Sequence, residues 1–267
     1  MHRSIFAIAN NPKTYPPQLC LTMIISCLKI IGVEPDDTII VAVDFMKSWR
    51  KQITDEYKSG RAKKRVDSGI DFPHWYKKFN ELTDHLEKVL DWHFIKIEHL
   101  EADDIMAICT RYYSDREVVL VTYDKDLEQC WSYPNVKIFS PMTKAYKLRP
   151  DNFNAYNFLA SKIKKEASDD LTSPILNEED YDRRMLCVNL LELPEWVEKS
   201  VRDKLDNLPA KQLNIEGIPF RVIKERYNGI FSNKDIVTYE DCLKKDERKE
   251  LKKKKAKAKA KEDVKCK

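Results

Sequence analysis

Two short runs of mainly β-branched residues set the fold class of this chain. They occupy residues 38–43 (TIIVAV) and 118–122 (VVLVT). An unbroken apolar run of this length is typical of a strand buried on both faces, and such strands belong to parallel sheets covered by helices. Helical apolar patterns alternate with these runs along the chain. We therefore expect an α/β fold built on a doubly wound parallel sheet.

Hydrophobic periodicity, together with proline and glycine, places the other elements. Helices are expected over residues 18–31, 75–89 and 101–112, and short strands over residues 95–97 and 136–139. From about residue 150 onward the strand signal fades and the pattern is helical. The longest apolar stretch has 13 residues and contains three polar side chains, so it is too short to cross a bilayer.

Charge divides the chain into a mildly acidic body and a basic tail. Residues 244–267 hold 13 Lys/Arg and 5 Asp/Glu, a net charge of +8, whereas the whole chain has a formal net charge of only +4. The tail lacks core-forming residues and is expected to be disordered. The five glycines are too scattered for a dinucleotide-binding or phosphate-binding loop. The seven cysteines form no C-x-x-C pair, which indicates reduced, cytosolic thiols.

Acidic residues stand where the predicted strands end or where the following helix begins. The residues in these positions are Asp44, Glu101, Asp103, Asp104, Asp124 and Asp126. Because the carboxyl ends of parallel strands meet at one edge of a sheet, we expect these side chains to lie close together. Any one of them alone could be an ordinary capping residue. The shared position of all six residues favours a metal-binding site over six separate capping residues.

That many carboxylates repel one another unless a cation lies between them. Oxygen ligands without histidine or cysteine suit Mg²⁺ or Mn²⁺. Two such ions about 4 Å apart can activate a water molecule and stabilise the leaving oxygen of a phosphodiester. A second acidic cluster, Glu166, Asp169 and Asp170, lies further along the chain, where a second domain could fold back.

The segment after Asp44 is rich in cations and poor in apolar residues, so we expect it to lie outside the core. Trp49 and Tyr57 are interleaved among its charges, as in surfaces that stack on bases. A solvated charged surface is the alternative, but the position beside an expected metal ligand favours contact with phosphates. The cations of this segment are Lys47, Arg50, Lys51, Lys58, Arg61, Lys63, Lys64 and Arg65.

Several of these segments resemble the 5′-nuclease superfamily, which includes flap endonucleases and PIN-like proteins. Residues 97–108 (IEHLEADDIMAI) and 118–129 (VVLVTYDKDLEQ) are similar to its paired acidic motifs. Residues 41–61 (VAVDFMKSWRKQITDEYKSGR) resemble its strand and helical arch. Residues 133–146 (YPNVKIFSPMTKAY) narrow the resemblance to the ribonuclease H group of T-even-type bacteriophages. The similarity covers roughly residues 2–175 well and the helical remainder loosely.

The resemblance implies a Mg²⁺-dependent 5′→3′ exonuclease and flap endonuclease with ribonuclease H activity, in which Mn²⁺ can substitute and two ions act. It implies that RNA primers and 5′ flaps are removed during phage DNA replication. The expected partners are DNA, RNA–DNA hybrids, 5′-flap structures and a single-stranded DNA-binding protein. We expect a monomer in the host cytoplasm that makes no contact with membranes. The expected parts are a core over residues 1–165 with an arch at about 47–69, a helical DNA-binding region over 166–243, and the tail.

The resemblance also implies roles for individual residues. Tyr57 and Lys58 match arch residues beside the scissile phosphate, and Lys58 with Arg61 would stabilise developing negative charge. Arg3 matches a substrate-contacting arginine, and Lys47, Arg50, Lys51, Lys63, Lys64 and Arg65 are expected to bind nucleic acid. The residues that match metal ligands are Asp44, Glu101, Asp103, Asp124, Asp126, Glu166 and Asp169, with Asp104 as an outer-sphere helper.

The beginning of the chain departs from the family pattern. The family starts with a central strand that ends in aspartate, whereas this chain starts at Met1-His2-Arg3. We expect a chain without that strand to be poorly stable and weakly active, unless residues 4–9 (SIFAIA) take the strand's place. Two other functions stay open. One is a non-catalytic binder of branched nucleic acid, and the other is a PIN-type ribonuclease that acts on single-stranded RNA.

Overall fold

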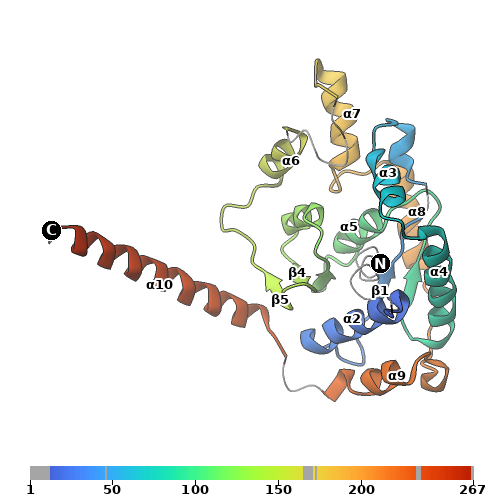
Figure 1. Cartoon of the computed structure of the whole chain (residues 1–267). Coiled ribbons are helices and arrows are strands. Elements are labelled where there is room, and N and C mark those ends of the chain that lie inside the picture. The colour runs from blue at the N-terminus through green and yellow to red at the C-terminus, as the bar shows by residue number, and fades with distance from the viewer. Residues whose placement is uncertain (1–12, 46, 165–170, 172, 233–235, 266–267) are drawn as a thin grey trace.

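The structure is a computed structural model that describes residues 13–45, 47–164, 171, 173–232 and 236–265. Helices surround short strands in the body, and a long C-terminal helix projects away from it (Figure 1). The α/β class predicted from the sequence is confirmed. None of the described helices combines the length and apolar character that a bilayer crossing requires. The expectations for residues 4–9 lie outside the described residues and stay predictions.

The strands of the described residues form two sheets. In one sheet β1 (Ile40–Ala42) pairs in parallel with β2 (His93–Ile95). In the other β3 (Val118–Val121) pairs in parallel with β4 (Val136–Ser140). The parallel pairing is as predicted, but no ladder within the described residues joins the two sheets into one. All three residues of β1 are half-buried, not fully buried as its sequence predicts, and within the described residues β1 pairs with β2 alone.

The pairing register sets which side chains meet across each sheet. Val41 lies opposite Phe94, and Leu120 lies opposite Ile138. A further strand, β5 (Ala145–Lys147), pairs with β4 in an antiparallel direction. The sequence analysis missed β5, because three residues are too few to show a strand period.

The described helices cover these sheets and extend beyond them. In chain order they are α2 (Pro16–Ile31), α3 (Gly60–Asp67), α4 (Phe72–Val89), α5 (Ala102–Tyr112), α6 (Ala155–Lys164), α7 (Glu178–Val188), α8 (Glu195–Asp206), α9 (Arg221–Asn228) and α10 (Tyr239–Lys265). Short 3₁₀ turns occupy η1 (Trp49–Gln52), η2 (Asp126–Ser132), η4 (Ile215–Gly217) and η5 (Ile230–Ser232). Helices α2, α4 and α5 confirm the three predicted from periodicity. Helix α2 ends at Gly32, whose φ of 80° is the left-handed conformation that glycine adopts most easily.

Helix α5 lies between the two sheets and packs on both. Ile105 and Ile108 belong to a buried cluster with Ile95 of β2. Ala107 belongs to a second cluster with Leu120 of β3. Because α5 touches both sheets, its first turn lies near the carboxyl ends of β1 and β3. This packing gives the acids at the start of α5 their position.

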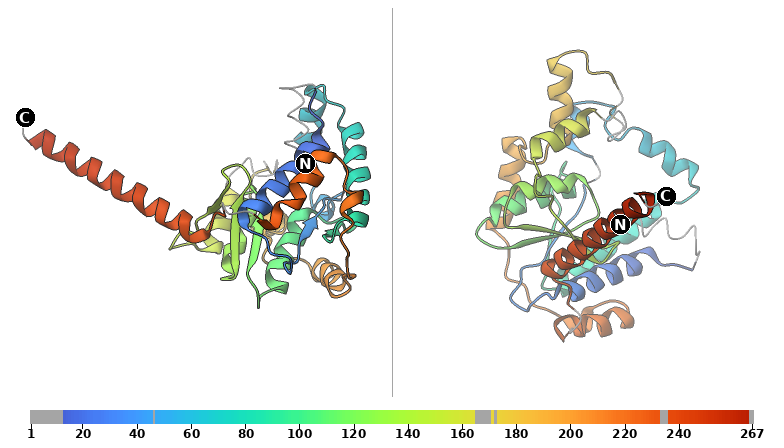
Figure 2. Two further views of the ribbon diagram at one scale, coloured as in Figure 1. Left: turned by 90° about the horizontal axis from the view of Figure 1, so that it is seen from below. Right: turned by 90° about the vertical axis from the view of Figure 1, so that its left-hand side faces the viewer.

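The C-terminal segment is one continuous helix in place of the predicted disordered tail. Its start is fixed to the body, because the hydroxyl of Tyr239 accepts a hydrogen bond from the backbone amide of Arg149 at 3.1 Å, and its ring packs against Tyr146. Beyond this anchor the helix points away from the body, as Figure 1 and the left-hand view of Figure 2 show. Alanine, lysine and glutamate favour helix strongly, so a sequence that cannot form a core can still be helical.

Candidate active site

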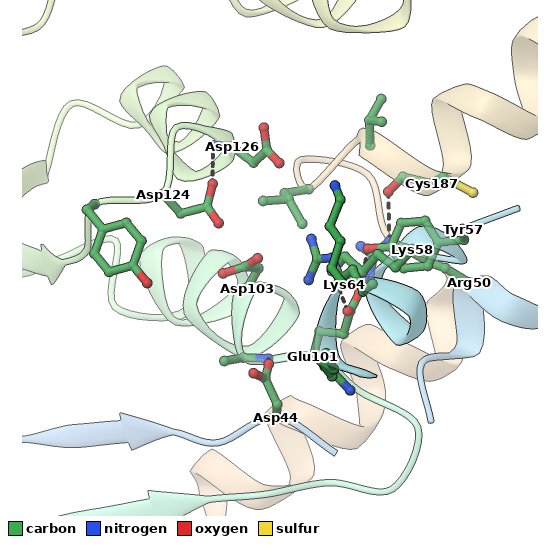
Figure 3. A pocket seen from close by; sticks show the side chains of 16 residues that line it. Asp44, Arg50, Tyr57, Lys58, Lys64, Glu101, Asp103, Asp124, Asp126 and Cys187 are labelled. Atoms are coloured by element: carbon green, nitrogen blue, oxygen red, sulfur yellow. Dashed lines mark hydrogen bonds and ion pairs between the residues drawn. The ribbon is translucent and has the colours of Figure 1, made fainter. Parts of the chain in front are cut away.

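A cleft of about 470 Å³ opens beyond the carboxyl ends of β1 and β3. Figure 3 shows four aspartates along one side of it and arginine, tyrosine and lysine side chains on the other, with a glutamate between them. The acidic residues that line the cleft are Asp44, Glu101, Asp103, Asp124 and Asp126. The structure therefore brings together five of the six acids that the sequence places at the sheet edge.

Backbone hydrogen bonds hold these acids at the ends of their strands. Asp44 lies just after β1, and its Oδ1 accepts a hydrogen bond from the backbone amide of Ala102 at 2.9 Å. Asp124 lies just after β3, and its Oδ1 accepts one from the amide of Asp126 at 2.9 Å. The hydroxyl of Thr122 in turn accepts a hydrogen bond from the amide of Asp124 at 3.0 Å. Asp124 is thus set by a local turn at the end of its strand, and Asp44 by the start of α5.

The first turn of α5 is closed by a capping box formed by Glu101 and Asp104. Oδ2 of Asp104 accepts a hydrogen bond from the amide of Glu101 at 3.0 Å. Carboxylates are also stabilised here by the positive end of the helix dipole. Asp104 is fully buried and does not line the cleft, so it lies behind the other acids.

Arg50 is the buried partner of these two carboxylates. Its exposed fraction is 1%, and its guanidinium donates to both carboxylate oxygens of Asp104, at 2.6 and 3.1 Å. It also donates to Glu101 at 2.9 Å and to the backbone carbonyl of Cys187 at 2.9 Å. Arg50 lines the cleft, but burial and these acceptors occupy its guanidinium, so its contact with nucleic acid stays a prediction.

Glu101 is also held by the segment that follows Arg50. The hydroxyl of Tyr57 donates to Glu101 at 2.7 Å, and Nζ of Lys58 donates at 2.6 Å. Burial alone raises the pKa of Glu101, but the positive charges of Lys58 and Arg50 outweigh it and lower the pKa to about 2. Tyr57 is only 3% exposed. The expectation that this whole segment lies outside the core is therefore wrong for its first half, because Trp49, Arg50 and Tyr57 are buried.

Asp103 occupies the most unfavourable place for a carboxylate in the cleft. Its burial raises its pKa to about 8, and the nearby charges of Asp124 and Asp44 add to this rise against the opposing effect of Lys58. Like charges and loss of hydration both disfavour the ionised form. The ionised form of Asp103 is therefore disfavoured unless a cation lies beside it.

One surface of α3 brings cations to the cleft. Arg61, Lys64 and Arg65 line it, as residues spaced three and four apart on one side of a helix can. Arg65 is fixed by aromatic rings, because its guanidinium carbon lies 5.8 Å from the ring centroid of Phe72 and 5.5 Å from that of Tyr76. Of the other predicted nucleic-acid contacts, Lys47, Lys51 and Lys63 are exposed and do not line the cleft.

The donor set fits a hard divalent cation. Within the described ranges, no group of three or more His, Cys, Asp or Glu side chains is already arranged to hold a metal ion. The chemistry of the cleft nevertheless suits one, because its acidic side chains are all carboxylates, the oxygen ligands that such a cation prefers. Three other predicted site residues, Arg3, Glu166 and Asp169, lie outside the described residues.

Two residues of the cleft region were missed by the sequence analysis. Lys162 of α6 forms an ion pair with Asp126. Tyr123, which stands between two strand-end residues, lines the cleft and is 40% exposed. Lys162 gave no local signal, since it lies in a lysine-containing helix far from Asp126 in the sequence. Tyr123 could have been noticed, because it directly precedes Asp124.

The fold and the acidic cleft define an α/β protein with a carboxylate-lined site that suits a divalent cation. The family described as 5′-3′ exonuclease, N-terminal resolvase-like domain, matches residues 1–157. Because that match covers more than half of the chain, the chain belongs to this family.

Individual relatives are more distant. The chain is 30% identical over 112 residues to the ribonuclease H of Enterobacteria phage T4, a match that covers 40% of this chain and 37% of that protein. Among solved structures it is similar to T5 5′-exonuclease with bound divalent metal ions (zinc), with a TM-score of 0.48, 17% identity, and 86% and 95% of the two chains covered. For the T5 D15 protein co-crystallised with metal ions, the TM-score is 0.45, the identity is 18%, and the coverage is 81% and 92%.

Proposed function

We propose that this chain is a divalent-metal-dependent 5′→3′ exonuclease and flap endonuclease with ribonuclease H-type activity. The observation that carries the proposal is the cleft with two unlike walls. Carboxylates of the strand ends form one wall, and cations of α3 line the cleft as well. An acidic wall suits a divalent cation, and a cationic wall suits the phosphates of a nucleic acid strand. Membership of the exonuclease family supports the same reaction class.

Different residues of the cleft have different roles in the proposed hydrolysis of a phosphodiester. Asp44, Asp103 and Asp124 would hold Mg²⁺, or Mn²⁺ in its place, which lowers the pKa of water and stabilises charge on a phosphate when bound. Arg61 and Lys64 would bind the phosphates of the substrate strand. Lys58 is placed at the same cleft to stabilise negative charge that develops at the phosphate, once its ammonium leaves the acid that it now contacts.

The proposed substrates are RNA–DNA hybrids and DNA with 5′ flaps, with the removal of RNA primers during phage replication as the biological task. The partial match to a phage ribonuclease H supports this choice. We further propose a monomer in the host cytoplasm, with contact to a single-stranded DNA-binding protein during replication. The free cysteines among the described residues are compatible with a reducing compartment.

Cleavage of three substrates tests the proposal. We expect the full chain to cleave a 5′-flap DNA and an RNA–DNA hybrid with Mg²⁺ and to lose both activities when the metal is chelated. Asp124→Asn should abolish cleavage, whereas Asp151→Asn, at an exposed site outside the cleft, should leave it unchanged. Cleavage of linear single-stranded RNA alone would contradict the proposal and support a PIN-type ribonuclease.

Metal binding gives a second, independent measurement. A ligand that binds only the native state increases the free energy of unfolding, by about 2.7 kcal/mol at a ligand concentration one hundred times the dissociation constant. The melting temperature rises as a result. We expect Mg²⁺ or Mn²⁺ to raise the melting temperature of the chain and Asp124→Asn to remove the rise. An equal rise in the variant would show that the ion binds elsewhere.

A second candidate function is a binder of branched nucleic acid that does not cleave it. The observation in its favour is that two of the cleft acids, Glu101 and Asp126, already have lysine partners. Retention of flap DNA in a gel-shift assay, without cleavage at any Mg²⁺ concentration, would support this candidate over the nuclease.

A further inference from the structure

Lys162 reaches one end of the acidic wall from a helix outside the strand edge. Its Nζ forms an ion pair with Oδ1 of Asp126. The side chains of Lys162 and Asp126 are 18% and 26% exposed, so the pair is largely shielded from water. Such a pair is less screened by salt than one on the open surface.

The packing of α6 holds Lys162 at this place. Leu159 and Ile163, on either side of it along the helix, are 5% and 0% exposed. They pack in one cluster with Tyr57 and Cys187. Helix α6 also contacts η2, which begins at Asp126. The backbone of α6 is therefore anchored beside the acid that Lys162 contacts.

The cleft acids fall into two groups by their cationic neighbours. Glu101 pairs with Lys58, and Asp126 pairs with Lys162. Asp44, Asp103 and Asp124, in contrast, form no ion pair with a lysine or arginine in the described part of the chain. The carboxylates of Asp44 and Asp124 accept hydrogen bonds from backbone amides, and Lys147 donates only to the backbone carbonyl of Asp124. The acids without an ion pair thus lie next to one another along the wall, from Asp124 through Asp103 to Asp44 (Figure 3).

We propose that the ammonium group of Lys162 takes the place of a second metal ion at Asp126, so that the cleft holds one divalent cation, at Asp44, Asp103 and Asp124. This inference rests on the proposed nuclease function. It expects one bound ion, whereas the sequence analysis expects two. An ion entering at Asp126 would have to displace Lys162 and leave its ammonium partly buried without a partner. A compact ammonium on a flexible stem can supply a point charge there without ordered metal ligands.

The number of bound Mn²⁺ ions per chain tests the inference. Binding is followed by the free Mn²⁺ signal in electron paramagnetic resonance, using the full chain without nucleic acid. We expect one ion for the wild type, two for Lys162→Gln and one for Lys162→Arg, which keeps the charge. Lys164→Gln, an exposed lysine on the same helix, should bind one ion as the wild type does.

Asp126→Asn provides a test that does not depend on changing α6. If Asp126 is not a ligand, this variant still binds one ion with unchanged affinity. Two ions in the wild type, or the same number in wild type and Lys162→Gln, would overturn the inference while leaving a metal-dependent nuclease intact. No bound ion in the wild type would overturn both the inference and the proposed function, so the two failures are distinguishable.

Discussion

Both halves of the basic segment after β1 contain lysine and arginine, but these side chains lie in opposite environments. In the first half, Trp49, Arg50 and Tyr57 are 4%, 1% and 3% exposed. In the second half, α3, the side chains of Arg61 and Lys64 are exposed to solvent and line the cleft. The first half is therefore part of the core, and the second is a surface that can meet a substrate.

The difference shows that composition does not separate a structural cation from a binding one. Arg50 is buried because two carboxylates of the α5 capping box lie against it and accept its hydrogen bonds. Lys64 has no such buried acceptor and stays in the cleft. A lysine or arginine has a structural role where buried carboxylates accept its hydrogen bonds. Where no such carboxylate lies nearby, its side chain is available to bind phosphates.

The largest expected effect is the loss of stability when Arg50 is replaced, and it tests the comparison between buried and exposed cations most directly. Arg50→Met leaves Asp104 buried without its partner, and removing one member of a buried pair costs about 3–5 kcal/mol. The neighbouring Lys51→Met, at an exposed position, should change stability by less than about 0.5 kcal/mol. Urea denaturation of both variants measures the contrast. Equal losses would mean that burial does not distinguish these cations.

Lys58 lies at the boundary between the two halves. Its replacement tests the comparison through kcat and substrate affinity. Lys58→Ala should lower kcat about 10²–10³-fold while changing substrate affinity much less, because its charge acts mainly in the transition state. Lys47→Ala, which alters an exposed lysine outside the cleft, should leave both parameters unchanged. A large rise in Kd with unchanged kcat would place Lys58 among the binding residues instead.

Within α3 the comparison predicts a smaller effect that separates adjacent lysines. Lys64 lines the cleft, whereas Lys63 does not. Lys64→Gln should weaken nucleic-acid binding and reduce the slope of log K against log salt by about 0.7–0.9, the value for one phosphate contact. Lys63→Gln should leave the slope unchanged. Binding isotherms at four salt concentrations measure it, and identical slopes for the two variants would count against a phosphate-binding surface on α3.

The sequence was sufficient where a local pattern fixes the position of a residue. Asp44 and Asp124 could be placed together because each follows a strand of a parallel pair, and all such strands end at the same side. Helix α5 could be predicted from its apolar spacing and its acidic first turn. These features depend on neighbours within a few residues, which periodicity and capping rules describe.

The sequence was insufficient where a residue depends on a distant partner. Arg50 and Asp104 are 54 residues apart, and Lys162 and Asp126 are 36 apart, so no local pattern joins them. A basic segment then resembles a solvated surface, although half of it is core. The extent of α10 was missed for another reason, because absence of a core pattern says nothing against helix propensity.

The smallest expected effect on stability concerns α10, whose contacts with the body among the described residues include those of Tyr239 near its start. Removal of residues 244–267 keeps Tyr239 and its contacts with Arg149 and Tyr146, so the melting temperature should stay within about 1 °C, as surface changes cost little. Tyr239→Ala, which removes that anchor, should lower it more. Because residues 244–267 hold 13 Lys/Arg and 5 Asp/Glu, their removal should also flatten the salt dependence of nucleic-acid binding if the helix touches phosphates. Identical salt slopes with and without these residues would limit α10 to a solvated, charged helix and leave the basic side of α3 as the surface for phosphates.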